Sequence, residues 1–166
     1  MTRSRLWIAA AISLALLCGV AVSAIEKRPL PAFDLIAMDG NSVVSTSLVK
    51  QGKWLLVYGQ IGCVSCDALF RAIDAKDQPL LPERMVIVVG GVGQAGAAKI
   101  ASAYPQLKKA QWFADPSRSM NAAVKMPGAP VTFGLRNDML EWEIAGVIPN
   151  VAALKSALIS WAGEIK

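Results

Sequence analysis

Two continuous apolar runs constrain the fold of this 166-residue chain more than any other feature. They read "KWLLVYG" over residues 53–59 and "RMVIVVGG" over residues 84–91, and each has the length and composition of a buried strand. Between them, residues 64–76 ("VSCDALFRAIDAK") carry apolar side chains at helical spacing with charges in between. Strand, helix and strand in this order indicate an α/β fold.

The segments on either side extend this alternation. The apolar stretch from Phe33 to Met38, the turn residues Asp39-Gly40 and a second short strand over residues 43–45 predict an N-terminal hairpin. Downstream, the sequence predicts a helix ending near Pro105, a strand over 111–115, a short helix opened by Pro116, a hairpin over 131–144 and a closing amphipathic helix capped by Asn150. The whole order predicts one domain built on a mixed sheet that is covered by helices on both faces.

Cys63 and Cys66 lie two residues apart where the first buried strand runs into the helix. If Cys63 stands at the start of the helix, the free backbone N–H groups and the positive end of the helix dipole favour its thiolate. We then expect the pKa of Cys63 to fall below the usual cysteine value of about 8.5, so that Cys63 is the nucleophile. Cys66, one turn further, would be covered and would act as the resolving thiol. A purely structural disulfide stays open, although so short a loop constrains the unfolded chain little.

The sequence contains no histidine, which removes several classes of site. Ser-His and Cys-His nucleophile pairs are excluded, and so are histidine metal ligands. The third cysteine, Cys18, lies in the N-terminal apolar segment, so a single mature chain has too few cysteines for a four-cysteine zinc site. Only a metal that bridges two chains remains as an alternative to a metal-free cysteine pair.

The N-terminus has the order of an export signal. Arg3 and Arg5 precede an uncharged apolar run from Leu6 to Val22, and small residues follow up to Ala24. We therefore predict a signal peptide cut after Ala24, or alternatively an uncleaved membrane anchor over residues 6–22, with one domain over residues 25–166. The basic residues should stay in the cytoplasm, so the domain is expected in the periplasm, where the cysteine pair can oxidise.

The charge balance argues against nucleic acid as a partner. Without Arg3 and Arg5, 15 of the 17 basic residues remain against 12 acidic residues, a net charge of +3. This charge is small and evenly spread, whereas a nucleic-acid surface is strongly and locally basic.

The pair Ala129-Pro130 stands immediately before a predicted strand, where proline is allowed only at the start or the edge. A cis bond here would present the backbone of Ala129 beside the cysteines, ready to pair with a substrate strand. An ordinary trans proline is the alternative, and the frequencies of X-Pro bonds favour it when these residues are considered alone.

Taken together, three segments resemble the thioredoxin superfamily, and specifically its exported TlpA/ResA-like, redoxin-domain branch. They are the hairpin "FDLIAMDGNSV", the strand that leads into Cys-x-x-Cys, and "DPSRSMNAAVKMPGAPVTFGLRND". The similarity covers nearly all of residues 30–164. It implies a thioredoxin-like mixed sheet flanked by helices, with the hairpin as an N-terminal extension. It also implies thiol–disulfide exchange through Cys63 and Cys66, and a cis Pro130.

The resemblance also bears on cofactors and partners. Because the two sulfurs carry the electrons, it implies no metal or organic cofactor. It implies cysteine-containing exported proteins as clients and a membrane redox partner, with residues 6–22 as a potential membrane tether.

The sequence departs from the family at the motif itself. "GQIG" replaces an aromatic-rich run before the first cysteine, and Val64-Ser65 lacks the usual proline between the cysteines. Val57 occupies the place of the buried acid of cytosolic thioredoxins, and Leu69 the place of a glutamate in ResA-like proteins. Asp67 is then the one nearby proton acceptor for Cys66.

These departures keep other functions open. A non-catalytic binding or assembly module with a structural disulfide is the main alternative, and a thiol peroxidase is a weaker one. "GVGQAG", residues 91–96, formally matches a dinucleotide-binding fingerprint with Asp115 as its acid. That fingerprint normally follows the first strand, so a loop between strand and helix is the preferred interpretation.

Overall fold

The computed structural model describes residues 22–23, 26–74, 82–146 and 150–163. The predicted signal or anchor segment, residues 6–22, therefore lies almost entirely outside the described residues. Within the described ranges, no helix is both long and apolar enough to cross a bilayer.

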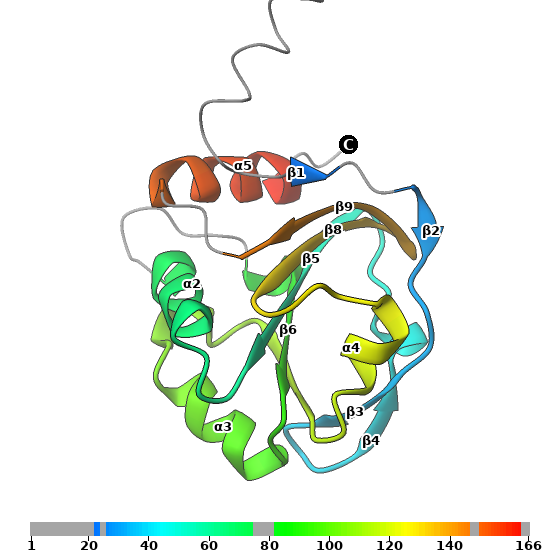
Figure 1. Ribbon diagram of the computed structural model, residues 1–166, viewed down its shortest axis with the longest axis vertical. Helices are drawn as coiled ribbons and strands as arrows, with labels where there is room; N and C mark the ends of the chain where they lie inside the picture. Colours follow the sequence, from blue (N-terminus) through cyan, green and yellow to red (C-terminus); the bar gives the residue numbers. More distant parts are fainter. Residues whose placement is uncertain (1–21, 24–25, 75–81, 147–149, 164–166) are drawn as a thin grey trace, which may run out of the picture.

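A single mixed sheet forms the centre of the molecule (Figure 1). Its middle strands are β5 (Lys53–Gln60), β6 (Met85–Gly90), β7 (Gln111–Asp115), β8 (Val131–Arg136) and β9 (Met139–Ala145). Strand β5 pairs in parallel with β6 and antiparallel with β8, while β7 lies parallel to β6 on its far side. All six residues of β6 are buried, as the continuous apolar run in the sequence predicts for a strand covered on both faces.

Short strands close both edges of the sheet. At the β7 edge, β3 (Asp34–Ala37) and β4 (Ser42–Val44) form the predicted antiparallel hairpin, and β3 pairs with β7. The turn between them depends on Gly40, which has a φ of 89° that an L side chain rarely adopts. At the other edge, β1 (Val22–Ser23) and β2 (Arg28–Pro29) pair antiparallel with β9.

Helices lie on both faces of the sheet, as predicted (Figure 1). On one face, α2 (Val64–Asp74), α3 (Gln94–Ser102) and α5 (Val151–Gly163) pack on the alternate side chains of β5 and β6. On the other face, α4 (Ser119–Val124) and the segment around Phe33 and Leu35 enclose a second apolar core. Single helical turns precede or follow three strands and are η2 (Ser45–Leu48), η3 (Pro82–Arg84) and η4 (Pro105–Leu107).

The N-terminal ends of α5 and α4 can be compared with the sequence predictions. The cap at Asn150 is confirmed, because its side-chain oxygen accepts the backbone N–H of Ala153 at 3.0 Å. The prediction that Pro116 opens a helix is wrong, since α4 begins at Ser119. The buried carboxylate of Asp115 accepts the backbone N–H of Ser119 at 2.8 Å and therefore supplies the cap from further upstream.

Near the C-terminal end of α5, the partly buried Trp161 makes several contacts with the sheet. Its ring packs edge-on against Trp142 with centroids 5.5 Å apart, and its indole N–H donates to the carbonyl of Trp54 at 3.4 Å. The ammonium group of Lys53 lies 4.5 Å from the ring centroid. Packing, a hydrogen bond and a cation–π contact thus meet on one side chain.

We predict that Trp161→Ala lowers the free energy of unfolding by about 3 kcal/mol, because it leaves a cavity between helix and sheet. Trp161→Phe keeps an aromatic ring but loses the N–H donor and part of the ring area, so its cost should be smaller, about 1 kcal/mol. Urea denaturation followed by circular dichroism measures both values. Equal losses for the two variants would show that the ring contact contributes little.

Candidate functional site

The cysteine pair follows closely after strand β5 in the chain. The strand ends at Gln60, and α2 begins at Val64, so Cys63 is the N-cap residue of this helix. The backbone N–H of Cys66 points back to Cys63, 3.0 Å from its carbonyl oxygen and 3.1 Å from its sulfur. The prediction that Cys63 stands at the helix start is confirmed. The two sulfurs are joined in a disulfide of 2.12 Å.

The two sulfurs differ in accessibility. Cys66 is 1% exposed and belongs to the apolar core between α2 and the sheet, whereas Cys63 is only partly buried. Two large apolar side chains beside Cys63 are open to solvent, Ile61 at 56% and Val64 at 84%. The sulfur of Cys63 therefore lies in an apolar surface region, and Cys66 is covered by the helix.

The Ala129-Pro130 bond is cis, which confirms the sequence prediction. The carbonyl oxygen of Ala129 lies 3.7 Å from the sulfur of Cys63, so the loop before β8 stands directly beside the disulfide. All four residues that the sequence singled out, Cys63, Cys66, Ala129 and Pro130, are thus brought to one place. Their catalytic and substrate-binding roles stay predictions.

Comparison of the sequence with family models and with curated proteins gave no match. Solved structures do match. A structure described as thiol:disulfide interchange protein DsbE of Chlorobium tepidum has a TM-score of 0.64 at 19% identity, covering 85% of this chain and 100% of that chain. A thio-disulfide isomerase of Thermus thermophilus has a TM-score of 0.60 at 20% identity, covering 86% and 99%. A secreted disulfide oxidoreductase of Mycobacterium tuberculosis has a TM-score of 0.58 at 15% identity, covering 80% and 96%.

The chain has a thioredoxin fold. Its sheet order, with β5 between β6 and β8, places the cysteine pair at the carboxyl end of a central strand, as the buried apolar run before the pair predicted. The hairpin of β3 and β4 is the predicted N-terminal extension of this fold.

A cavity of about 360 Å³ opens beside the disulfide of this thioredoxin fold. Asp67 is the one acidic residue among those that line it. One carboxylate oxygen of Asp67 accepts from Arg71 at 2.7 Å, and the other accepts from the hydroxyl of Tyr104 at 2.6 Å. The bond from Arg71, followed by that from Tyr104, lowers the pKa of Asp67 below its ordinary value of 3.8. Asp67 is therefore a weaker proton acceptor than its position beside Cys66 suggested.

Tyr104 is the site residue that sequence reasoning missed. Burial, with the hydrogen bond to Asp67, raises its pKa to about 12, so the hydroxyl remains a donor at neutral pH. Its ring packs edge-on against Phe70 at 5.3 Å and stacks on Trp112 at 6.3 Å. Tyr104 follows α3 and lies 37 residues from Asp67 in sequence, so no local sequence pattern predicts the contact between them.

The dinucleotide interpretation finds no support. "GVGQAG" forms the loop between β6 and α3 and the start of that helix, which is the preferred prediction for it. The carboxylate that would bind a ribose belongs to Asp115, which is fully buried and accepts the backbone N–H groups of Ser119 and Met120. In the described part of the chain, no group of three or more histidine, cysteine or acidic residues is placed to hold a metal.

We predict that Tyr104→Phe raises the pKa of Asp67 toward 3.8, because one of its two side-chain donors is lost while Arg71 stays. The bond stabilises the fold at pH values above 3.8, and that contribution is lost as the pH falls through the lower, folded-state pKa. NMR titration of the Asp67 carboxyl carbon measures the shift. Tyr58→Phe, which alters the chain's other tyrosine, is the matched control. An unchanged Asp67 pKa in Tyr104→Phe would contradict the bond.

Proposed function

We propose that the protein is a periplasmic thiol–disulfide oxidoreductase that exchanges disulfides with cysteine-containing exported proteins. The observation that carries this proposal is the asymmetry of the cysteine pair. Cys63 caps α2 with an accessible sulfur beside the Ala129 carbonyl, whereas Cys66 is buried one turn behind it. A nucleophile and a resolving thiol need this arrangement.

In the reducing direction, the Cys63 thiolate attacks one sulfur of a client disulfide. A bond forms between Cys63 and that sulfur, the client disulfide breaks, and the second client sulfur leaves as a thiolate. The Cys66 thiolate then attacks Cys63, which restores the Cys63–Cys66 disulfide and releases the first client sulfur as a thiolate. The protein loses two electrons and the client gains them. The reverse sequence oxidises a client dithiol.

The surroundings of each sulfur support these roles. The N–H of Cys66 and the positive end of the α2 dipole stabilise a negative sulfur at Cys63. The side chain of Cys66 packs among apolar residues such as Leu69 and Val57, so its nearest accessible electrophile is Cys63 itself. A client can approach Cys63 over the exposed Ile61 and Val64, with the Ala129 carbonyl as a partner for its backbone.

The structural relatives support the same chemistry and a similar location. The matched proteins from Chlorobium tepidum and Mycobacterium tuberculosis are described as a disulfide interchange protein and a secreted disulfide oxidoreductase. A further match, with a TM-score of 0.54 and 20% identity, is an exposed lipoprotein thioredoxin of Streptococcus pneumoniae. Together with the N-terminal apolar run over residues 6–22, they favour export, a membrane tether or cleaved signal, and a membrane redox partner.

We predict that Cys66→Ser traps covalent complexes with client proteins, because Cys63 can still attack but nothing resolves the mixed disulfide. Cys63→Ser should abolish both trapping and turnover. Non-reducing electrophoresis of purified protein mixed with a disulfide-containing substrate such as insulin measures trapping, and a reductant should release the complexes.

Iodoacetamide labelling of the reduced protein is the control on these roles. Cys63 should react faster than Cys66, since it is the more exposed and the better stabilised thiolate. Faster labelling of Cys66 would reverse the assignment. A disulfide that resists dithiothreitol, with no reaction of either thiol, would favour the non-catalytic binding module.

We predict that a reporter fused after Lys166 is active only if it works in the periplasm, since Arg3 and Arg5 should remain cytoplasmic. Paired fusions to alkaline phosphatase and to a cytoplasm-specific reporter measure this in a bacterial host. Activity of the cytoplasmic reporter alone would overturn the periplasmic location. It would not bear on the exchange chemistry, which the cysteine variants test separately.

A further inference from the structure

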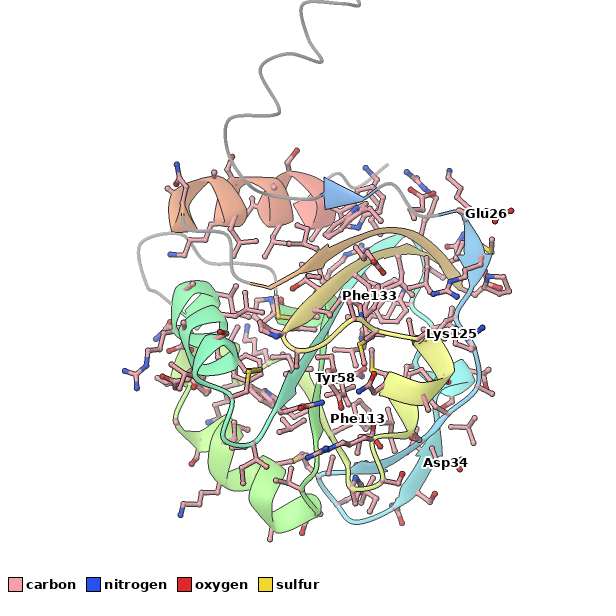
Figure 2. All side chains as sticks on the ribbon, in the orientation of Figure 1. Glu26, Asp34, Tyr58, Phe113, Lys125 and Phe133 are labelled. Carbon is pink, nitrogen blue, oxygen red and sulfur yellow. A yellow bond between two sulfur atoms is a disulfide. The ribbon has the colours of Figure 1, made fainter. Side chains whose placement is uncertain are left out.

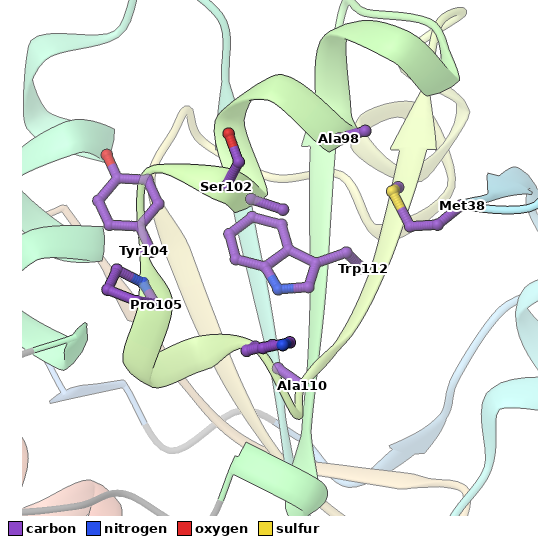
Figure 3. A pocket seen from close by; sticks show the side chains of 9 residues that line it. Met38, Ala98, Ser102, Tyr104, Pro105, Ala110 and Trp112 are labelled. Atoms are coloured by element: carbon purple, nitrogen blue, oxygen red, sulfur yellow. The ribbon is translucent and has the colours of Figure 1, made fainter.

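A second cavity, of about 440 Å³, lies on the α3 side of the molecule beyond the disulfide. Figure 3 shows the indole of Trp112 at its centre, with Met38 on one side and Tyr104 on the other. Ala98 from α3 borders it, and Lys108 after η4 also lines it. Nothing in the exchange chemistry of Cys63 and Cys66 uses this cavity.

The second cavity adjoins the disulfide cavity. Tyr104 lines both, so the two cavities meet at this residue. Consecutive residues of α3 also take part, Ile100 in the disulfide cavity and Ala101 in the second one. A polypeptide whose cysteine is bonded to Cys63 can therefore extend past Tyr104 and reach the second cavity.

The walls of the second cavity select for an apolar group. The polar atoms of its two large rings are already engaged, the Trp112 N–H by the carbonyl of Leu107 at 3.1 Å and the Tyr104 hydroxyl by Asp67 at 2.6 Å. What these rings offer to an occupant is their apolar surface. Transfer of an apolar side chain from water onto this surface lowers the free energy through the hydrophobic effect.

The rim of the second cavity carries a positive charge. Lys108 makes no ion pair among the described residues, whereas its neighbour Lys109 pairs with Glu83 at 3.2 Å. An unpaired ammonium group at the edge of an apolar pocket favours an acidic residue next to the apolar one.

We propose that the second cavity is a client-specificity site. It binds a large apolar side chain of an extended client segment, and Lys108 pairs with an acidic residue beside that side chain, while the client's cysteine reacts with Cys63. This proposal rests on the proposed exchange function and names the class of client segment that reacts fastest.

Peptides with a single cysteine test the proposal. Each carries the cysteine as a mixed disulfide with thionitrobenzoate, and a Phe-Asp pair is moved stepwise along the chain on either side of it. Attack by the Cys63 thiolate on the peptide sulfur releases the coloured thionitrobenzoate, and Cys66 then frees the peptide thiol. At one spacing, the Phe-Asp peptide should react about tenfold faster than its Ser-Ser counterpart, since one apolar side chain becomes buried.

Three variants, compared with wild-type protein, assign that gain to the second cavity. Ala98→Trp fills the cavity and should remove the gain, whereas Ala95→Trp, on an exposed position of the same helix, should keep it. Lys108→Glu should change the preference from Phe-Asp to Phe-Lys. Every peptide rate is divided by the rate of the same variant with glutathione–thionitrobenzoate, a small disulfide that cannot reach the cavity.

The outcomes separate this proposal from the exchange function. A gain that survives Ala98→Trp, or no gain at any spacing in the wild-type protein, would overturn the specificity site while reaction with the small disulfide upholds the exchange. Absence of reaction with every disulfide, the small one included, would overturn both.

Discussion

The close approach of α2 to β5 at Gly59 is the contact on which the site depends. A Cβ atom at residue 59 would lie 2.6 Å from the ring of Phe70 and 3.3 Å from the Cβ of Cys66, closer to the ring than real atoms come. Glycine therefore lets the first turns of α2 lie directly on the strand. Cys66 is pressed into the core, and Cys63 stays at the edge as the cap. Figure 2 shows Tyr58 of β5 and Phe133 of the neighbouring β8 in the interior of the molecule. The division between an accessible and a covered sulfur follows from this one packing distance.

The same contact extends to both cavities. Phe70, held against Gly59, packs on Tyr104 at 5.3 Å and on Trp112 at 5.8 Å. Because these rings are in mutual contact, the position of α2 fixes the wall of the disulfide cavity and the wall of the cavity behind it. Close-packed interiors transmit shape in this way, since their side chains have little free space in which to move.

Features encoded locally could be predicted from the sequence. The apolar runs give β5 and β6, the Asp-Gly turn gives the first hairpin, and the junction of strand and helix places Cys63 at the start of α2. The start of α4 could not be predicted, because the choice between Pro116 and Ser119 depends on the buried carboxylate of Asp115. The cis Ala129-Pro130 bond came from the family resemblance, since X-Pro frequencies alone favour trans.

Contacts between residues far apart in sequence were beyond prediction from local patterns. The bond from Tyr104 to Asp67 and the cavity around Trp112 arise only when α3 and η4 dock beside α2. In the sequence, Tyr104 stands at the end of a predicted helix before Pro105, and Trp112 lies within a predicted strand. The relevance of both residues to function depends on contacts with residues that are distant in sequence and come close only in the folded protein.

The proton of Cys66 has few acceptors near it, because Val57 and Leu69 stand at the two places where the resemblance led us to expect an acidic residue. Val57 is completely buried on the face of β5 that packs against Cys66, where a carboxylate would be costly to desolvate. Asp67 is nearby, but Arg71 and Tyr104 hold it as a carboxylate of lowered pKa, and such a group accepts protons poorly. The proton of Cys66 must then pass to water or to the leaving client thiolate through the open cavity. The apolar core around Cys66 thus stabilises the fold, and protons are exchanged with water or client on the exposed side of the pair, at Cys63.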